Sequence, residues 1–246
     1  MTTRMRPSLL TIALALCCSA GAAAQLDENP KPANQGHDVG EDSGRSDDQI
    51  VAGLKQALEF GTSKAVALAG KSDGFLNNET IRILLPTKLQ SVGKAMRLLG
   101  EGETVDDLEI DMNRAAERAT PQAKPIFLDA IKKMNVTRTG ARHILAGGTT
   151  AATEYFQQTC SADLSAAFSP IVHGALQRTG VIKKYDHVIK TAPGGNAIAN
   201  EFDLDKYVVG KTLDGLFYML GQEEIKIRTT PAAQTTPLLK EVFTRK

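Results

Sequence analysis

Apolar residues recur at three- and four-residue steps along most of the chain after residue 45, a spacing that predicts amphipathic helices. The first predicted helix runs from the N-cap candidate Ser46 to about Gly70, and Asp47 and Asp48 suit its positive end. Its apolar stripe comprises Ile50, Leu54, Ala57, Leu58, Gly61, Ala65 and Leu68. The same spacing continues to the C-terminus, so the fold class is predicted to be all-α.

Capping residues and helix breakers predict the boundaries of the later helices. Thr120-Pro121 predicts that a new helix begins there, since proline is favoured at the first helical position. Gly147-Gly148 ends a helix, after which Thr149 can start another, and a further helix is expected from Ser161 to Gly180. Thr236-Pro237 is expected to open a short closing helix.

Two segments depart from the amphipathic pattern. Between Asp203 and Arg228 the apolar residues fall on nearly every side of a helix, which is typical of a buried one. Residues Thr80 to Leu85 alternate like a strand, but one short strand does not make a sheet. We therefore predict a single irregular bundle of about eight to ten helices around a buried central helix near the C-terminus.

The N-terminal residues resemble a secretory signal peptide. Arg4 and Arg6 precede an apolar run from Leu9 to Cys18, and Ala22-Ala23-Ala24 offers a cleavage site before Gln25. The predicted organisation is a signal peptide at 1–24, a flexible polar linker at 25–45 and one helical domain at 46–246. The expected location is the periplasm or the exterior. A lipoprotein is disfavoured because no small residue precedes Cys17 or Cys18.

Charge and cysteine usage exclude some classes of function. The chain has 29 basic and 28 acidic residues, and loss of Arg4 and Arg6 would leave 27 and 28, which gives no electrostatic case for a nucleic-acid partner. No later segment is long and apolar enough to predict a transmembrane helix. Cys160 is then the remaining cysteine, and Ala166, Ala167 and Phe168 nearby favour a buried, unreactive thiol.

Motifs for metal binding or nucleophilic catalysis are not found, and no metal site or cofactor is predicted. The most suggestive polar residues are Asn113, Arg114 and Glu117, which a helical projection places between the main apolar arc and the isolated Ile110. If both apolar zones pack, Asn113 and Glu117 are buried and need hydrogen-bond partners. The favoured interpretation is a structural polar network, and the alternative is a ligand site or a catalytic carboxylate.

A second polar cluster lies at the end of the predicted central helix. Glu224 and Arg228 are spaced for an intrahelical ion pair, which predicts a solvated helix end. The alternative is an anion site at Arg228, aided by the helix that Thr236-Pro237 opens. A small-residue run from Ala146 to Thr153 precedes Tyr155; it predicts tight helix packing or, alternatively, the lining of a ligand cavity.

Several motifs together resemble the exported bacterial family catalogued as domain of unknown function 4197, over roughly residues 47–243. They are Asp73-Gly-Phe75, Ile81-Arg-Ile-Leu-Leu-Pro86, Met112-Asn-Arg-Ala-Ala-Glu-Arg-Ala119, Ile144-Leu-Ala-Gly147, Ala151-Ala-Thr-Glu-Tyr-Phe156, Glu223-Glu-Ile-Lys-Ile-Arg228 and Thr236-Pro-Leu-Leu-Lys240. The resemblance implies a helical, secreted or periplasmic protein with no assigned activity. It carries over no catalytic residues.

The expected function is a non-enzymatic, exported helical domain that binds a small or lipid-like molecule or a protein partner in the cell envelope. One alternative is an enzyme that uses Glu117 or Glu224 as acid or base, with Arg114 or Arg228 on an anionic substrate. A third possibility is a purely structural envelope protein. An apolar cavity would favour the binding domain, whereas convergent polar groups would favour the enzyme.

Overall fold

The computed structural model describes residues 46–195, 197 and 202–244, so the expected signal peptide and linker lie outside the described residues. The described part holds eight α-helices and two short 3₁₀ turns, η1 (Thr87–Leu89) and η2 (Pro231–Ala233), and no strand. The helices are α1 (Asp47–Ala69), α2 (Gln90–Leu98), α3 (Gly102–Lys133), α4 (Arg138–Ala146), α5 (Ala151–Thr179), α6 (Val181–Thr191), α8 (Leu204–Thr229) and α9 (Pro237–Phe243). The predicted all-α class is confirmed.

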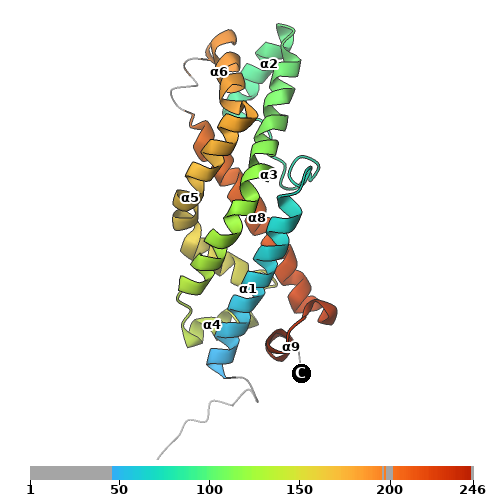
Figure 1. Ribbon diagram of the computed structural model, residues 1–246, viewed down its shortest axis with the longest axis vertical. Helices are drawn as coiled ribbons and strands as arrows, with labels where there is room; N and C mark the ends of the chain where they lie inside the picture. The colour runs from blue at the N-terminus through green and yellow to red at the C-terminus, as the bar shows by residue number, and fades with distance from the viewer. Residues whose placement is uncertain (1–45, 196, 198–201, 245–246) are drawn as a thin grey trace, which may run out of the picture. The chain divides into compact units, whose positions relative to one another are not determined.

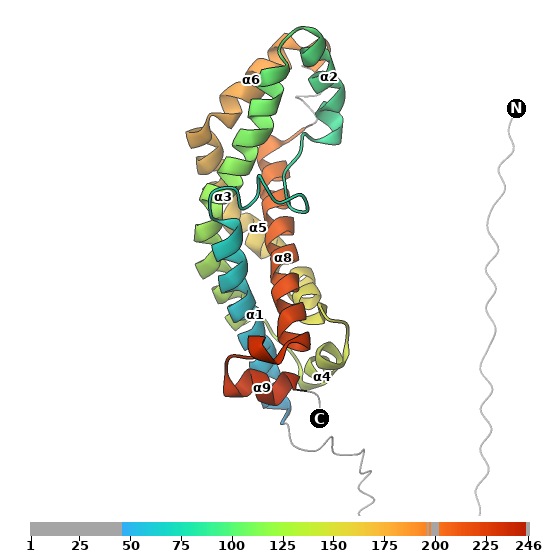
Figure 2. The ribbon, with the colours of Figure 1, turned by 90° about the vertical axis from the view of Figure 1, so that its right-hand side faces the viewer.

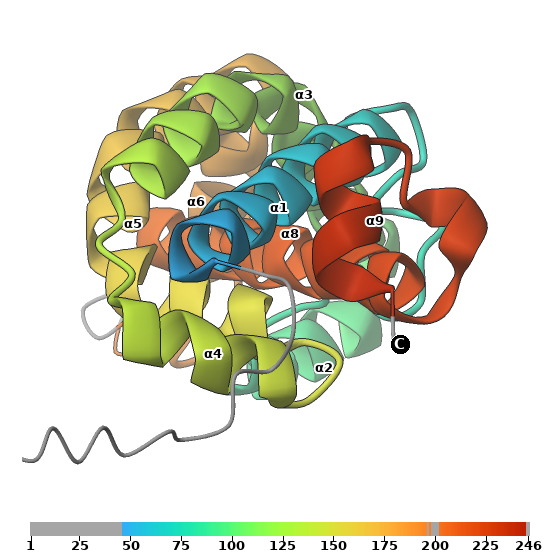
Figure 3. The same ribbon diagram turned by 90° about the horizontal axis from the view of Figure 1, so that it is seen from below.

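Four long helices, α1, α3, α5 and α8, form the body of the bundle (Figure 1). Helix α3 packs on α5 and α1, and α8 packs on α1 and α5. At one end α2 and α6 lie beside the start of α3, while at the other α4 and α9 pack against α1 (Figure 2). Seen along the bundle, α8 lies among the other long helices (Figure 3). This is the arrangement expected for the predicted central helix.

The core is aliphatic, with a small cluster of phenylalanine rings where three of the long helices meet. Phe127 of α3, Phe156 of α5 and Phe217 of α8 lie with their ring centroids 5.4 to 5.7 Å apart. Cys160 is buried near this core, as predicted, and carries a free thiol. Burial of these large side chains from separate helices is what holds the bundle together.

Two expected helix starts are wrong. Helix α3 continues through Pro121, and Thr120 donates its hydroxyl to the Ala116 carbonyl instead of capping a new helix. Likewise α5 begins at Ala151, and Ser161 donates to the Gln157 carbonyl inside it. Because a hydroxyl can bond the carbonyl four residues earlier, these residues do not have to end a helix. Packing of α3 and α5 against each other favours the continuous helices.

The capping predictions at the ends of the domain are confirmed. Ser46 and Gln49 form a complete capping box at the start of α1. The Asp203 side chain accepts from the Lys206 N–H at the start of α8, and Thr236 accepts from Leu239 at the start of α9. In each case the side chain satisfies one of the donors that a helix start leaves unpaired.

Candidate functional site

A polar stripe on α3 holds the connection between α1 and η1. One oxygen of Glu117 accepts hydrogen bonds from the backbone N–H groups of Phe75 and Leu76, both at 3.1 Å. Its other oxygen accepts from Arg114 at 2.8 Å, and Arg114 also donates to Asp73 at 2.8 Å. The hydrogen bond to Glu117, more than any other factor, raises the pKa of Arg114. The buried Glu117 carboxylate therefore accepts hydrogen bonds from three donors.

The turn that reaches Glu117 depends on the Asp73-Gly74 pair. Asp73 has a φ of 64°, in the left-handed region that aspartate tolerates better than most residues. A Cβ atom on Gly74 would lie 2.4 Å from the Ala69 carbonyl oxygen, so no larger residue fits there. This turn brings the Phe75 and Leu76 N–H groups to the carboxylate.

One helical turn earlier, Asn113 binds the extended residues of the same connection. Its amide oxygen accepts from the Ile83 N–H at 2.8 Å, and its amide nitrogen donates to the Ile83 carbonyl at 2.8 Å. The amide nitrogen also donates to the Glu109 carbonyl at 2.8 Å, and the Glu109 carboxylate accepts from Leu85 at 2.8 Å. Asn113 thus supplies the donor and the acceptor that a neighbouring strand would supply.

The predicted burial of Asn113 and Glu117 is confirmed, but the expected cause is wrong. Ile110 is 37% exposed, so no second apolar zone covers these side chains. The connection between α1 and η1 covers them instead. Glu109 belongs to the same network, because its carboxylate accepts a hydrogen bond from the Leu85 N–H. The predicted strand-like alternation is seen in burial, because Ile81, Ile83 and Leu85 are buried and Arg82 and Leu84 are exposed.

The second predicted cluster is also tied to the backbone. Glu224 accepts from the N–H groups of Ala152 at 3.0 Å and Thr153 at 2.7 Å, in the first turn of α5. The Thr153 hydroxyl donates to it at 2.6 Å, and Arg228 donates at 2.8 Å. Glu224 is only 2% exposed, so the prediction of a solvated helix end is wrong for this residue. A carboxylate stabilises a helix start by accepting its free donors.

Arg228 joins the same place to the preceding helix. It donates to the carbonyls of Leu145 at 2.9 Å and Ile144 at 3.0 Å, in the last turn of α4, and its guanidinium lies over Phe243. Arg228 therefore binds the end of α4, and Glu224 binds the start of α5. The small residues between these helices allow that close approach. At the predicted anion site of Arg228, the anion that the structure shows is the Glu224 carboxylate.

Tyr155 belongs to neither cluster. Its hydroxyl donates to the Asn135 carbonyl at 2.7 Å, which attaches α5 to the link between α3 and α4. Across the described ranges, no hydrogen bond joins Asn113, Arg114 or Glu117 to Glu224 or Arg228. The structure therefore places the six predicted site residues in three separate locations.

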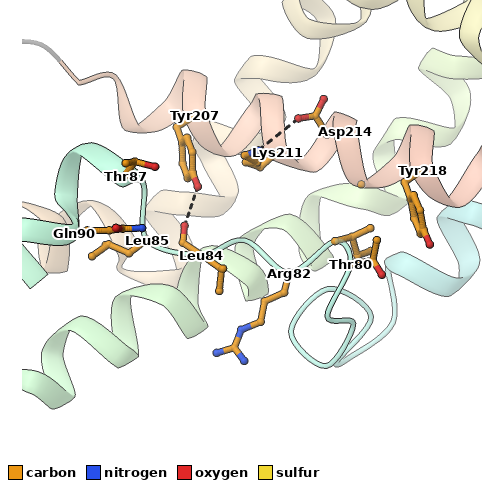
Figure 4. A pocket seen from close by; sticks show the side chains of 12 residues that line it. Thr80, Arg82, Leu84, Leu85, Thr87, Gln90, Tyr207, Lys211, Asp214 and Tyr218 are labelled. Carbon is orange, nitrogen blue, oxygen red and sulfur yellow. Dashed lines mark hydrogen bonds and ion pairs between the residues drawn. The ribbon is translucent and has the colours of Figure 1, made fainter.

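A cleft that was not predicted lies elsewhere in the bundle. It has a volume of about 620 Å³ and lies between residues 80–87, with Gln90, and α8 (Figure 4). The α8 wall is a stripe of polar and aromatic residues on a helix that is mostly apolar: Tyr207, Lys211, Asp214 and Tyr218. On the two sides of the cleft, Leu84 is 56% and Tyr218 is 42% exposed. We call this cleft the α8 groove.

The backbone of the extended segment forms one wall of the α8 groove. Because Ile83 turns its N–H and C=O to Asn113, the adjacent Arg82 carbonyl and Leu84 N–H point the other way. Within the described residues neither of these two groups has a hydrogen-bond partner. The Leu84 carbonyl is different, since it accepts from the Tyr207 hydroxyl at 2.9 Å (Figure 4).

The charged groups of the α8 groove are loosely paired. Arg82 lies 4.0 Å from Glu109, and Lys211 lies 3.8 Å from Asp214, so both cations remain accessible. Burial, followed by the negative charge of Glu109, raises the pKa of Tyr207, which keeps its hydroxyl a donor. A signal was present in the sequence: residues 207, 211, 214 and 218 follow helical spacing and interrupt the apolar pattern of this segment.

Other classes of site are not seen in the part of the chain that the structure describes. No group of three or more histidine, cysteine, aspartate or glutamate side chains there is placed to hold a metal ion. None of the described helices combines the length and the apolar character needed to cross a bilayer.

Fold and site together define the class of protein as an all-α bundle. Buried polar side chains bind the backbone of the connection between α1 and η1 and of the start of α5, and an exposed groove follows the central helix. The chain belongs to the family described as "Protein of unknown function (DUF4197)", whose model matches residues 44–244. Neither the curated proteins nor the solved structures contain a significant match. The family assignment therefore brings no activity, and function has to be argued from the geometry.

Proposed function

We propose that this protein is a non-enzymatic binding domain of the bacterial cell envelope and that the α8 groove holds its ligand. The observation that carries the proposal is the exposed stripe on α8. Tyr207, Lys211, Asp214 and Tyr218 are polar or aromatic residues that lie between the buried positions of α8, and all four line the same groove. Tyrosines that offer an apolar ring and a polar tip are typical of binding surfaces.

The surroundings of Glu117 and Glu224 favour the binding function over the enzyme alternative. Both carboxylates accept two backbone N–H groups and one arginine, and neither lines the α8 groove. Hydrogen bonds of this kind give both side chains a structural role in holding the backbone. The charged and hydroxyl groups of Lys211, Asp214 and Tyr218 in the lining favour a hydrogen-bonding ligand over a lipid-like one.

Export is the second part of the proposal, and it is supported by residues 1–24. Their basic start, short apolar run and small residues before Gln25 match a secretory signal peptide. A near-neutral chain is consistent with a partner other than nucleic acid. The exposure of Leu84 and Tyr218 beside a groove supports a binding role over a purely structural one.

The test is site-specific photo-crosslinking in cells that express the full chain. A benzophenone amino acid at Tyr218 should form a defined adduct, identified by mass spectrometry. The same amino acid at Gln122, an exposed position on α3, is the positional control. The adduct at Tyr218 should disappear when Lys211→Glu is added. Absence of an adduct at Tyr218, or the same adduct at Gln122, would contradict the proposal.

A further inference from the structure

We infer that the ligand of the α8 groove is the extended C-terminal segment of a partner polypeptide, which pairs with the backbone of residues 82–84. This inference rests on the proposed function and adds the chemistry of the partner. Three observations carry it: an unpaired backbone edge, its rigid support and the position of Tyr207 and Lys211 at one end of the groove.

The unpaired edge has the pattern of a strand that lacks its neighbour. The Arg82 carbonyl and the Leu84 N–H flank Ile83 and have no partner within the described residues. A peptide residue opposite Ile83 can donate its N–H to the Arg82 carbonyl, and its own carbonyl can accept from the Leu84 N–H, as in a parallel ladder. An antiparallel peptide could bond the same two groups through two different residues, so the edge alone does not set the direction. The direction is set by the charge on the α8 wall, where Lys211 favours the carboxylate end of the peptide.

The edge is held rigid from the α3 side. Asn113 fixes both polar groups of Ile83, and Glu109 fixes the Leu85 N–H, all at 2.8 Å. Binding a peptide therefore does not require the receiving segment to become ordered. Such preorganisation lowers the entropic cost of association, and backbone pairing to an existing edge is a recurrent way of recognising peptides.

The direction of the peptide follows from the two ends of the groove. A parallel peptide would enter near Thr80 and Tyr218 and run toward Leu84, where the Tyr207 hydroxyl reaches across from α8 to the Leu84 carbonyl (Figure 4). A C-terminus placed before this bridge avoids the Tyr207 ring, while Thr87 and Gln90 line the cleft beyond it. Lys211 lies one helical turn after Tyr207 on α8, and its Nζ is 3.8 Å from Asp214 Oδ2. This accessible cation can bind a terminal carboxylate. A volume of about 620 Å³ falls within the usual range of ligand sites.

The experiment selects peptides against the purified protein from a random heptapeptide library displayed with free C-termini. A selected synthetic peptide should bind, and replacing its C-terminal carboxylate by an amide should weaken binding about tenfold or more. Hydrogen exchange at the Leu84 amide should slow when the peptide is bound. Lys211→Glu should weaken binding to a similar extent, whereas Gln122→Glu should not.

Substitutions at Leu84 separate the backbone from the side chain. Leu84→Pro removes the N–H and should abolish binding, while Leu84→Ala keeps the N–H and should bind more tightly than the proline variant. Proline is compatible with the extended residue that precedes it. If Leu84→Pro does not fold, the protection of the Leu84 amide in the unmodified protein still decides the question.

Several outcomes would overturn the inference. They are failure to select any peptide, equal binding of the free acid and the amide, or unchanged exchange at the Leu84 amide with peptide bound. Binding of an N-acetylglucosamine oligomer at the groove instead of a peptide would also overturn it. If the crosslink at Tyr218 forms in that case, the proposed function stands and only the class of ligand is wrong.

Discussion

Asn113 on α3 and Ile83 in the connection between α1 and η1 are joined by two hydrogen bonds of 2.8 Å, one in each direction. Asn113 has no exposed surface, and its amide nitrogen also donates to the Glu109 carbonyl. A primary amide is required for this arrangement, since it must offer one acceptor and two donors at the same place.

Asn113→Asp should destabilise the protein. It replaces the amide nitrogen, which donates to the Ile83 and Glu109 carbonyls, with an oxygen that cannot donate to them. We expect a loss of about 1–3 kcal/mol in the free energy of unfolding, or more if the new carboxylate stays charged. Chemical denaturation measures it. Asn77→Asp is the matched control, since Asn77 is exposed in the same connection. Equal stability of the two variants would show that the Asn113 amide is not needed.

Glu117→Ala should also lower the stability, because it leaves the Phe75 and Leu76 N–H groups without their acceptor and Arg114 without a buried partner. Hydrogen bonds to a charged group are worth about 1.5–3 kcal/mol, so the melting temperature should fall clearly. Glu109→Ala removes the acceptor of one N–H and should cost less than Glu117→Ala. The exposed Glu79 is the control. An unchanged melting temperature for Glu117→Ala would refute the structural interpretation of this carboxylate.

Glu224 and Arg228 should behave as one unit, because together they hold the end of α4 and the start of α5. In a double-mutant cycle, Glu224→Ala and Arg228→Ala should cost less combined than the sum of the two single losses. Glu224→Ala should also speed hydrogen exchange at the Ala152 and Thr153 amides. The coupling energy should be near zero for Glu224→Ala combined with Gln122→Ala on α3. Additive losses would mean that the two side chains act independently.

Two glycines of α8 should respond in opposite ways to alanine. A Cβ atom on Gly215 would lie 2.7 Å from the buried Phe75 ring and 3.2 Å from Ile81, so Gly215→Ala should cost about 1–3 kcal/mol. Nothing lies within 4 Å of the corresponding position on Gly210, so Gly210→Ala should stabilise α8 by about 0.5–1 kcal/mol. Thermal denaturation of the two variants tests both signs. A stable Gly215→Ala would mean that the connection between α1 and η1 can move away from α8.

Cys160 should react slowly with thiol reagents in the folded protein. Burial, followed by the negative charge of Asp163, raises the pKa of its thiol, so less thiolate is present at any given pH than in the unfolded chain. Its curve of labelling rate against pH should therefore lie at higher pH in the folded protein than in denaturant. Mass mapping of the labelled peptide identifies the site. The neighbouring cleft of about 310 Å³ makes this a demanding test, and equal rates in both states would contradict it.

The sequence determined the helical class, the end caps and most of the core. These features depend on local periodicity and on side chains that bond their own helix, as at Ser46, Asp203 and Thr236. It also predicted the burial of Asn113 and Glu117, although the expected cause, a second apolar zone at Ile110, was wrong. The alternation of residues 80–85 was visible because it is a local pattern with a period of two residues.

The tertiary structure decided what those patterns do. Helices α3 and α5 continue past Thr120 and Ser161 because packing between them favours long helices over a local stop. The partners of Glu117 and Glu224 are backbone N–H groups some forty and seventy residues away, which no local pattern specifies. The α8 groove exists because Asn113 and Tyr207 hold the segment at residues 80–87 beside the polar and aromatic stripe of α8. Its unpaired edge follows from that pairing, so only the folded chain reveals it.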